Sequence, residues 1–171
     1  MVFIADSAIG GDPFERDTVQ EIIELLGRKP QGDAKVVLRY RTDGRAAVLQ
    51  NYPLFYDGTP MPTLYWLVDR ELVRSVSRLE SEGVIRLMRS MVDQDELATS
   101  HRAYANARDS LLPSDYSGVR PHGGVGGTDR GIKCLHAHLA WYLVGWDDPV
   151  GVMVAETVGI SRDEFVNYEG W

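Results

Sequence analysis

The segment from Pro121 to Leu143, PHGGVGGTDRGIKCLHAHLAWYL, gathers most of the reactive side chains of the sequence. It holds the only cysteine, Cys134, and three of the four histidines, His122, His136 and His138. A thiolate serves as a nucleophile or a metal ligand, and an imidazole serves as a base or a ligand near neutral pH. The residue types therefore leave three alternatives open: a catalytic site, a metal site, or a buried helix that follows a glycine-rich loop.

The glycine-rich loop is a candidate site for an anion. Its glycines are Gly123, Gly124, Gly126 and Gly127. Glycine reaches backbone conformations that leave N–H groups free to face a ligand, and a helix predicted to start at Thr128 or Asp129 would add its positive end. Arg130, Lys133 and His136 would add donors there. A surface loop that binds nothing is the alternative, since exposed loops are common and variable.

Helical spacing suggests how Cys134 would work in an enzyme. In the first turn of the predicted helix, the helix dipole and Lys133 favour a thiolate. His138, four residues on, would share the face of Cys134, whereas His136 would point to the opposite side. The catalytic hypothesis thus uses Cys134 as nucleophile and His138 or His122 as base. The alternative is a Cys134 side chain buried as a small apolar group.

A metal site is incompletely specified by the spacing. Cys134 and His138 give a pair, His122 supplies a third ligand, and structural zinc requires four. Carboxylates such as Asp129 or Glu80 could complete the set, but nothing in the spacing selects them. We therefore predict no metal ligand and no cofactor, and keep a structural zinc site as the second alternative to ligand binding.

The first half of the chain is predicted to form one helix and three strands. Asp17 and Gln20 resemble a capping box for a helix that ends at Gly27. Apolar alternation predicts a hairpin over 35–51 with a two-residue turn at Asp43-Gly44, and a third strand over 63–68. In the first strand, Val36, Leu38 and Tyr40 are expected on one face. Arg39 and Arg41 are expected on the other, where Arg39 could support an anion site.

The second half is predicted to be helical. A helical period begins after Asp69, is interrupted at Gly83, resumes near Asp93 and stops at Pro113. His101 lies on the apolar face of the helix that starts near Asp93, and it is interpreted as a hydrogen-bonded core residue. Residues 113–130 form the longest loop, and Ser161 is expected to cap a last turn. The fold prediction is α+β: a small antiparallel sheet of about three strands, one face covered by about five helices, in one domain over 1–171 with 1–14 and 160–171 as loosely attached termini.

The composition narrows the class of partner. The net charge of −7 and the pI near 5.0 argue against nucleic-acid binding, which needs a dense basic face. No apolar run approaches the length of a membrane span, and a single cysteine without a basic leader favours the cytoplasm. The expected partners are a small anionic ligand or another protein, bound in a regulatory role.

Three strings in this order resemble the bacterial domain-of-unknown-function 501 family. They are DGTPMPTLYWL at Asp57–Leu67, RLESEG at Arg78–Gly83 and RGIKCLHAHLAW at Arg130–Trp141. The resemblance implies an actinobacterial protein without an established activity, in a cytoplasmic setting. The genes of family members lie near those for enolase, a septum-formation initiator and an exopolyphosphatase, which implies links to division or phosphate metabolism.

Two positions depart from the family pattern that the resemblance implies. Many members carry a cysteine where this chain has Tyr40, and a histidine where it has Trp141. A metal or redox site built on those residues would be incomplete in this chain, because tyrosine is a poor substitute for a thiolate toward zinc. The departures favour ligand or partner binding over metal or thiol chemistry.

Overall fold

The sheet is built on a hairpin between β1 (Ala34–Tyr40) and β2 (Ala46–Asn51). The computed structural model describes residues 13–167, with side chains from residue 19 onward. β3 (Tyr65–Leu67) pairs with β2, and β4 (Phe165–Asn167) pairs with β1, so the antiparallel order is β3-β2-β1-β4. The α+β prediction is confirmed, and the described residues hold one strand more than expected.

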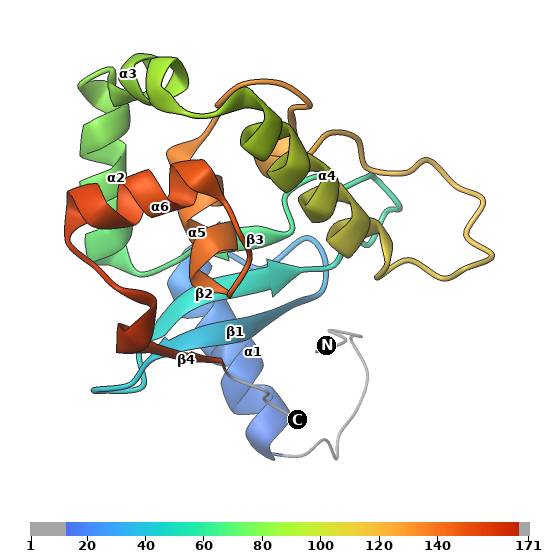
Figure 1. Ribbon diagram of the computed structural model, residues 1–171. Coiled ribbons are helices and arrows are strands. Elements are labelled where there is room, and N and C mark those ends of the chain that lie inside the picture. The colour runs from blue at the N-terminus through green and yellow to red at the C-terminus, as the bar shows by residue number, and fades with distance from the viewer. Residues whose placement is uncertain (1–12, 168–171) are drawn as a thin grey trace.

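Helices cover both faces of this sheet, rather than the single face that we expected. The six α-helices of the described residues are α1 (Pro13–Leu26), α2 (Arg70–Ser81), α3 (Val84–Met91), α4 (Gln94–Asp109), α5 (Leu135–Leu143) and α6 (Pro149–Val158). In Figure 1, α1 lies on one side of the strands and the other five helices gather on the opposite side. Two short 3-10 turns, η1 (Val125–Gly127) and η2 (Arg162–Glu164), complete the elements.

A bulge in β1 places Val36 and Leu38 on opposite faces of the sheet. Val36 pairs with Leu49 and packs under α1, whereas Leu38 pairs with Val48 and packs in the core beneath α5 and α6. The register shifts between Val36 and Leu38, and an extra residue in one strand reverses the direction of the side chains that follow. The expectation that Val36 and Leu38 share a face is therefore wrong.

Aspartates set the starts of three helices. Asp69, Asp93 and Asp148 each accept hydrogen bonds from backbone N–H groups of the first turn, at α2, α4 and α6. Gly83, at φ +78°, separates α2 from α3 as predicted. The start predicted for the first helix is wrong, because α1 begins at Pro13 and Asp17 lies inside it. Proline is favoured in a first turn, where its missing N–H costs nothing.

The hairpin turn and the C-terminal segment also differ in detail from expectation. The turn spans residues 41–45, because the Tyr40 N–H donates to the Arg45 carbonyl and the Gly44 N–H donates to that of Tyr40. Ser161 caps η2, as predicted, and the structure shows that it does so within a capping box with Glu164. The next residues form β4, so residues 165–167 of the C-terminal segment are held in the sheet, while 1–12 and 168–171 lie outside the described residues.

None of the helices in the described part of the chain combines the length and apolar character that crossing a bilayer requires.

Candidate functional site

Cys134 precedes the helix that was expected to contain it. Helix α5 begins at Leu135, and Cys134 is its N-cap residue in an extended conformation. Gly131 adopts a left-handed conformation at φ +67°, and its carbonyl accepts from His101 while the Ile132 carbonyl accepts from Arg89. Residues 128–134 form a loop, and two of its carbonyls are bound by side chains from α3 and α4. The predicted start at Thr128 or Asp129 is wrong.

The glycine loop is closed against the protein. The N–H groups of Gly124 and Gly127 donate to carbonyls within the loop, and the N–H of Val125 donates to Nδ1 of His101 at 3.1 Å. A Cβ on Gly124 would lie 2.6 Å from the His101 side chain, so only glycine allows this approach to α4. The loop therefore uses the amides of Gly124 and Gly127 for its own packing, whereas ligand binding by Gly123 and Gly126 stays a prediction. Arg130 and Lys133 remain exposed beside it.

The loop carbonyls converge on a buried arginine that the sequence did not single out. The Arg108 side chain is 1% exposed and donates to the carbonyls of Gly123 at 2.5 Å and Pro121 at 3.2 Å. Longer contacts reach the carbonyls of His122 and Pro62 at 3.4 Å, and Nε binds the Asp109 carboxylate. Arg108 thus ties the loop to the end of α4.

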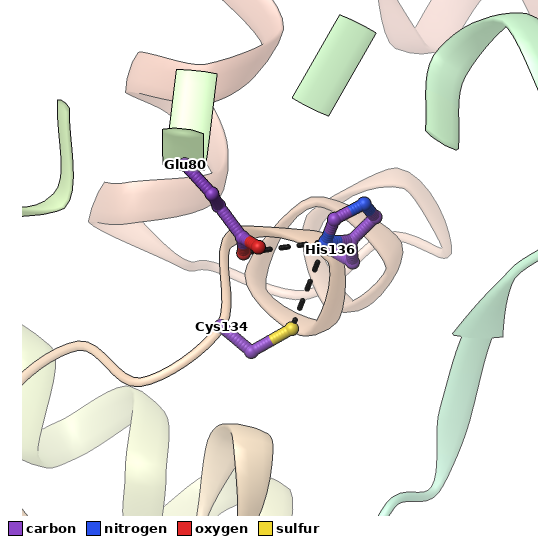
Figure 2. A group of neighbouring side chains, drawn as sticks. All are labelled: Glu80, Cys134 and His136. Atoms are coloured by element: carbon purple, nitrogen blue, oxygen red, sulfur yellow. Dashed lines mark hydrogen bonds and ion pairs between the residues drawn. The ribbon is translucent and has the colours of Figure 1, made fainter. Parts of the chain in front are cut away.

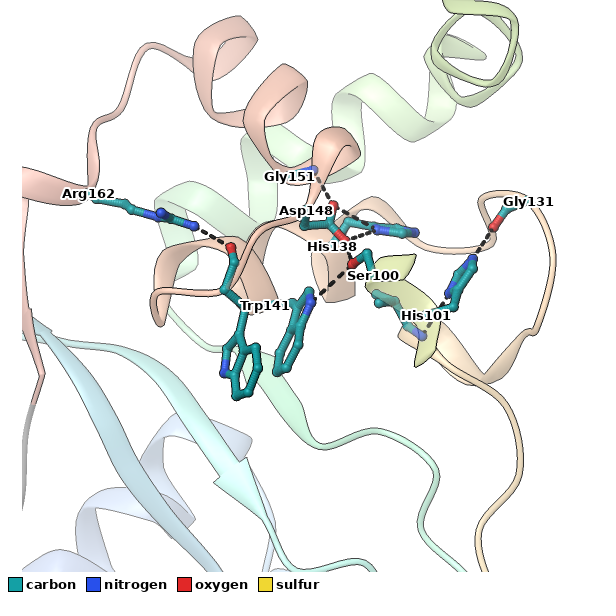
Figure 3. Close-up of polar contacts among 10 residues, drawn as sticks. Ser100, His101, Gly131, His138, Trp141, Asp148, Gly151 and Arg162 are labelled. Carbon is teal, nitrogen blue, oxygen red and sulfur yellow. Dashed lines mark hydrogen bonds and ion pairs between the residues drawn. The ribbon is translucent and has the colours of Figure 1, made fainter. Parts of the chain in front are cut away.

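His138 belongs to a buried network instead of a pair with Cys134. Its Nδ1 lies 2.9 and 3.0 Å from the two carboxylate oxygens of Asp148, and both side chains are fully buried. Asp148 also accepts from the Ser100 hydroxyl at 2.7 Å and from the Gly151 N–H at 2.5 Å, while Trp141 donates to Ser100 (Figure 3). This network joins α4, α5 and α6, which makes His138 a structural residue.

His101 joins the glycine loop to α4 through both ring nitrogens. Nε2 donates to the Gly131 carbonyl and Nδ1 accepts from Val125, so the ring is neutral with its proton on Nε2 (Figure 3). Burial lowers the pKa of His101 below its usual 6.5, and the hydrogen bond to the Gly131 carbonyl opposes this shift. His138 lowers the pKa further, while Asp148 and Asp129 raise it. The interpretation of His101 as a hydrogen-bonded core residue agrees with this geometry.

Acid is therefore expected to loosen the glycine loop. A histidine with a depressed pKa stabilises the fold above about pH 6.5, and this contribution is lost as the pH falls through the lower folded value. Protonation of Nδ1 removes the bond from Val125. We expect exchange of the Val125 amide, corrected for intrinsic rates, to accelerate between pH 7.5 and 5. The amide of Met61, bonded to Pro53 in a loop without histidine, is the internal control. Equal acceleration of both amides would contradict the role of His101.

Cys134 meets His136 and Glu80 in a cluster at the start of α5, which we call the Glu80–Cys134–His136 cluster. Nδ1 of His136 lies 3.8 Å from Sγ of Cys134 and 3.2 Å from Oε1 of Glu80 (Figure 2). Glu80 comes from α2, and its Oε1 also accepts from the Leu135 N–H at 2.7 Å. The predicted pairing of Cys134 with His138 is wrong, because Cys134 lies outside the helix and the i, i+4 rule does not apply there.

The second nitrogen of His136 is held by α2. Nε2 donates to the Val73 carbonyl at 3.2 Å and lies 3.1 Å from the Ser77 hydroxyl. The hydrogen bond with Cys134 raises the pKa of His136 to about 9, the Glu80 carboxylate adds to the rise, and partial burial opposes it. The ring is therefore an imidazolium at neutral pH when no other cation occupies the cluster.

The remaining predicted residues lie apart from this cluster. Arg39 forms a two-point ion pair with Glu21 of α1 at 2.7 and 2.8 Å, while Arg41 donates to the Asp163 carbonyl. The two arginines therefore do not form a shared guanidinium surface. His122 is 86% exposed and lies 3.5 Å from the Asp129 carboxylate.

A family model described as "Protein of unknown function (DUF501)" matches residues 37–156. The chain belongs to the DUF501 family. The match covers more than half of the chain and includes all three members of the Glu80–Cys134–His136 cluster. No curated protein and no solved structure matches the chain at a significant level. Evidence on the function of this DUF501 member therefore comes from its own geometry.

Proposed function

We propose that the protein binds a divalent transition metal ion, with zinc the best fit, through Glu80, Cys134 and His136. The observation that carries the proposal is the convergence of a thiol, a carboxylate and an imidazole nitrogen, whose ligand atoms all lie within 4.8 Å of one another. Thiolate, imidazole and carboxylate are the three ligand types of protein zinc sites. From the sequence, structural zinc was only the second alternative, because the spacing does not show that Glu80 lies beside His136. The fold brings these two residues together.

The distances support a tetrahedral arrangement. With zinc bonds of about 2.0–2.3 Å, a tetrahedron places nitrogen about 3.3 Å from oxygen and about 3.6 Å from sulfur. The corresponding separations are 3.2 Å from Nδ1 to Oε1 and 3.8 Å from Nδ1 to Sγ. An ion could enter by displacing the proton on Nδ1, and the thiol and carboxylate ligand atoms, which lie within 4.8 Å of each other, would need a separation of about 3.6 Å.

The contacts around His136 support metal binding over a catalytic triad. In a triad, the nucleophile and the acid contact different ring nitrogens. Here Cys134 and Glu80 both approach Nδ1, and the Val73 carbonyl fixes the proton on Nε2. A backbone carbonyl on the second nitrogen is the usual support of a metal-bound histidine, because it orients the ring and keeps the lone pair on the ligand nitrogen.

Three protein ligands leave a fourth position for water or for a group of a bound ligand. Each member of the cluster is only partly buried, and the exposed Lys133 directly precedes Cys134. The anionic ligand predicted from the sequence stays a prediction. The metal ion, instead of the glycine amides, would supply the positive charge that attracts it. When bound, the ion would act as a Lewis acid on that ligand.

Metal titration of the full chain tests the proposal. Protein freed of metal by chelator should take up one equivalent of Zn²⁺, and with Co²⁺ it should develop a near-ultraviolet thiolate-to-cobalt band. We expect Cys134→Ser to abolish the band and His136→Asn to weaken binding at least 100-fold. Ser77→Ala, which removes an outer contact, should weaken binding about 10-fold. His122→Ala is the matched control and should bind as the parent does.

Thiol chemistry is the second candidate, favoured by the His136 imidazolium beside Sγ. It makes a different demand on the same protein. If Cys134 is an active nucleophile, it should react with iodoacetamide much faster than a model thiol when both are measured in excess chelator. A protein that uses Cys134 only in this way would show no thiolate-to-cobalt band. Under the metal proposal, stoichiometric Zn²⁺ should protect Cys134 from alkylation. Failure to bind Zn²⁺ or Co²⁺, or unchanged binding by Cys134→Ser, would refute the metal site.

A further inference from the structure

A second surface feature lies away from the Glu80–Cys134–His136 cluster, between the start of α4 and the start of α6. It is a groove of about 720 Å³, within the size range of small-molecule sites. Its lining combines apolar side chains, including Ala103, Trp146 and Val152, with the acidic side chains of Asp95, Glu96 and Asp147. We call it the Trp146 groove.

An immobilised aromatic ring forms one side of the groove. Trp146 stacks on the fully buried Trp141, with ring centres 4.4 Å apart and planes within 11°. Trp146 is nevertheless 42% exposed, so the stacked ring still presents apolar surface to solvent. Because the stack already fixes the ring, a ligand that packs on it loses little additional side-chain entropy.

The charge of the groove has one sign. Asp95, Glu96 and Asp147 are exposed, and none of their carboxylates forms an ion pair within residues 19–167. Asp148 also lines the groove, but its buried carboxylate is already bonded to His138, Ser100 and Gly151, so the three exposed carboxylates carry the charge. Among the described residues, the lining contains no lysine or arginine. Two guanidinium groups contact lining residues from outside: Arg102 donates to the Thr99 hydroxyl at 2.9 Å, and Arg162 donates to the Trp146 carbonyl.

We propose that the Trp146 groove binds a small organic cation, an ammonium or guanidinium group carried on an apolar frame. The apolar frame packs against Trp146, Val152 and Ala103, while the cationic head faces the carboxylates. The face of an indole ring attracts cations. The stacked Trp146 ring and the surrounding carboxylates therefore combine this attraction with charge attraction in one concave site. A simple metal cation would gain nothing from the apolar lining. This proposal does not depend on the metal site.

Titration with matched probes tests the proposal. Benzylammonium and benzamidine would be added to the ¹⁵N-labelled full chain, and the indole and amide signals of Trp146, Ala103 and Val152 followed. We expect saturable shifts with both cations, and at least 10-fold weaker binding of benzyl alcohol and benzoate, which share the ring but lack the positive charge. Salt should weaken binding of the cations and leave that of benzyl alcohol unchanged.

Variants assign the binding to the groove. Asp147→Asn removes one exposed charge and is expected to weaken benzylammonium about 3–10-fold. Trp146→Leu should weaken it at least 10-fold, and its amide spectrum reports whether the fold is retained. Glu82→Gln, which removes an exposed carboxylate elsewhere, should change nothing. Equal binding of cation and alcohol, no saturable shift with either cation, or unchanged affinity in Asp147→Asn would overturn the proposal.

Discussion

Replacing Arg108 by leucine is expected to lower the free energy of unfolding by about 3–5 kcal/mol. The change leaves the carbonyls of Gly123 and Pro121 buried without their donors and removes the ion pair with Asp109. Each buried acceptor without a partner costs about 1–3 kcal/mol. Two such carbonyls, together with the space left by the smaller side chain, give the stated range. Urea unfolding followed by tryptophan fluorescence measures the change.

Two further variants separate the causes of this loss. Arg108→Lys keeps the charge but loses the planar fork that reaches several carbonyls at once, so it should recover only part of the stability. Arg102→Leu, on the exposed side of the same helix, removes one contact to Thr99 and should stay within about 0.5 kcal/mol of the parent. Equal effects at positions 102 and 108 would contradict the role given to Arg108.

Removal of the Asp148 carboxylate is expected to have a comparable effect, again about 3–5 kcal/mol. Asp148→Ala deprives His138, Ser100 and Gly151 of their common acceptor. All of these contacts are buried, and the N-cap of α6 is lost as well. Because the network joins three helices, the loss should appear as cooperative destabilisation in both thermal and urea unfolding.

The chain supplies a close control for this variant. Asp147 is the preceding residue, is exposed and caps no helix, so Asp147→Ala should change stability by no more than about 0.5 kcal/mol. Asp148→Asn keeps an oxygen for the Gly151 N–H and should fall between the parent and Asp148→Ala. A loss below about 1 kcal/mol in Asp148→Ala would mean that the network is hydrated and contributes little.

The elements with local signals were predictable from sequence. Asp69 and Asp93 cap helices where the period of apolar residues changes, and Gly83 divides two helices because its φ is positive. The bulge in β1 was not predictable, because it depends on how β2 pairs and leaves the alternation of the sequence intact. The bulge places Val36 in the core under α1 and Leu38 in the core under α5 and α6.

The sequence predicted the segment that holds the Glu80–Cys134–His136 cluster, but not which residues form it. Cys134 and His136 stand in the segment with the reactive side chains, yet helical spacing paired Cys134 with His138. The helix begins only at Leu135, after a loop whose carbonyls bind His101 and Arg89. Cys134 therefore lies outside the helix, where its side chain contacts His136 instead of His138. Glu80 lies more than 50 residues earlier, and only the packing of α2 beside α5 brings it to His136.

Arg108 shows a different limit of sequence reasoning. A single arginine near the end of a helix is typical of a solvated surface position. Its burial follows from the long loop that returns to α4 with carbonyls facing inward. The residues of that loop are compatible with many paths, so the sequence predicts that a loop exists without indicating which charged group it encloses.

The pairing of β1 with β4 has a consequence for synthesis on the ribosome. Tyr40 of β1 pairs with Phe165 of β4. The ribosome must therefore add roughly 125 residues after Tyr40 before the partner strand exists. At cellular elongation rates this takes about 6–25 s, far longer than a hairpin needs to form. During that interval the nascent chain exposes the backbone donors and acceptors of β1, and the last strand to be translated is the one that covers them.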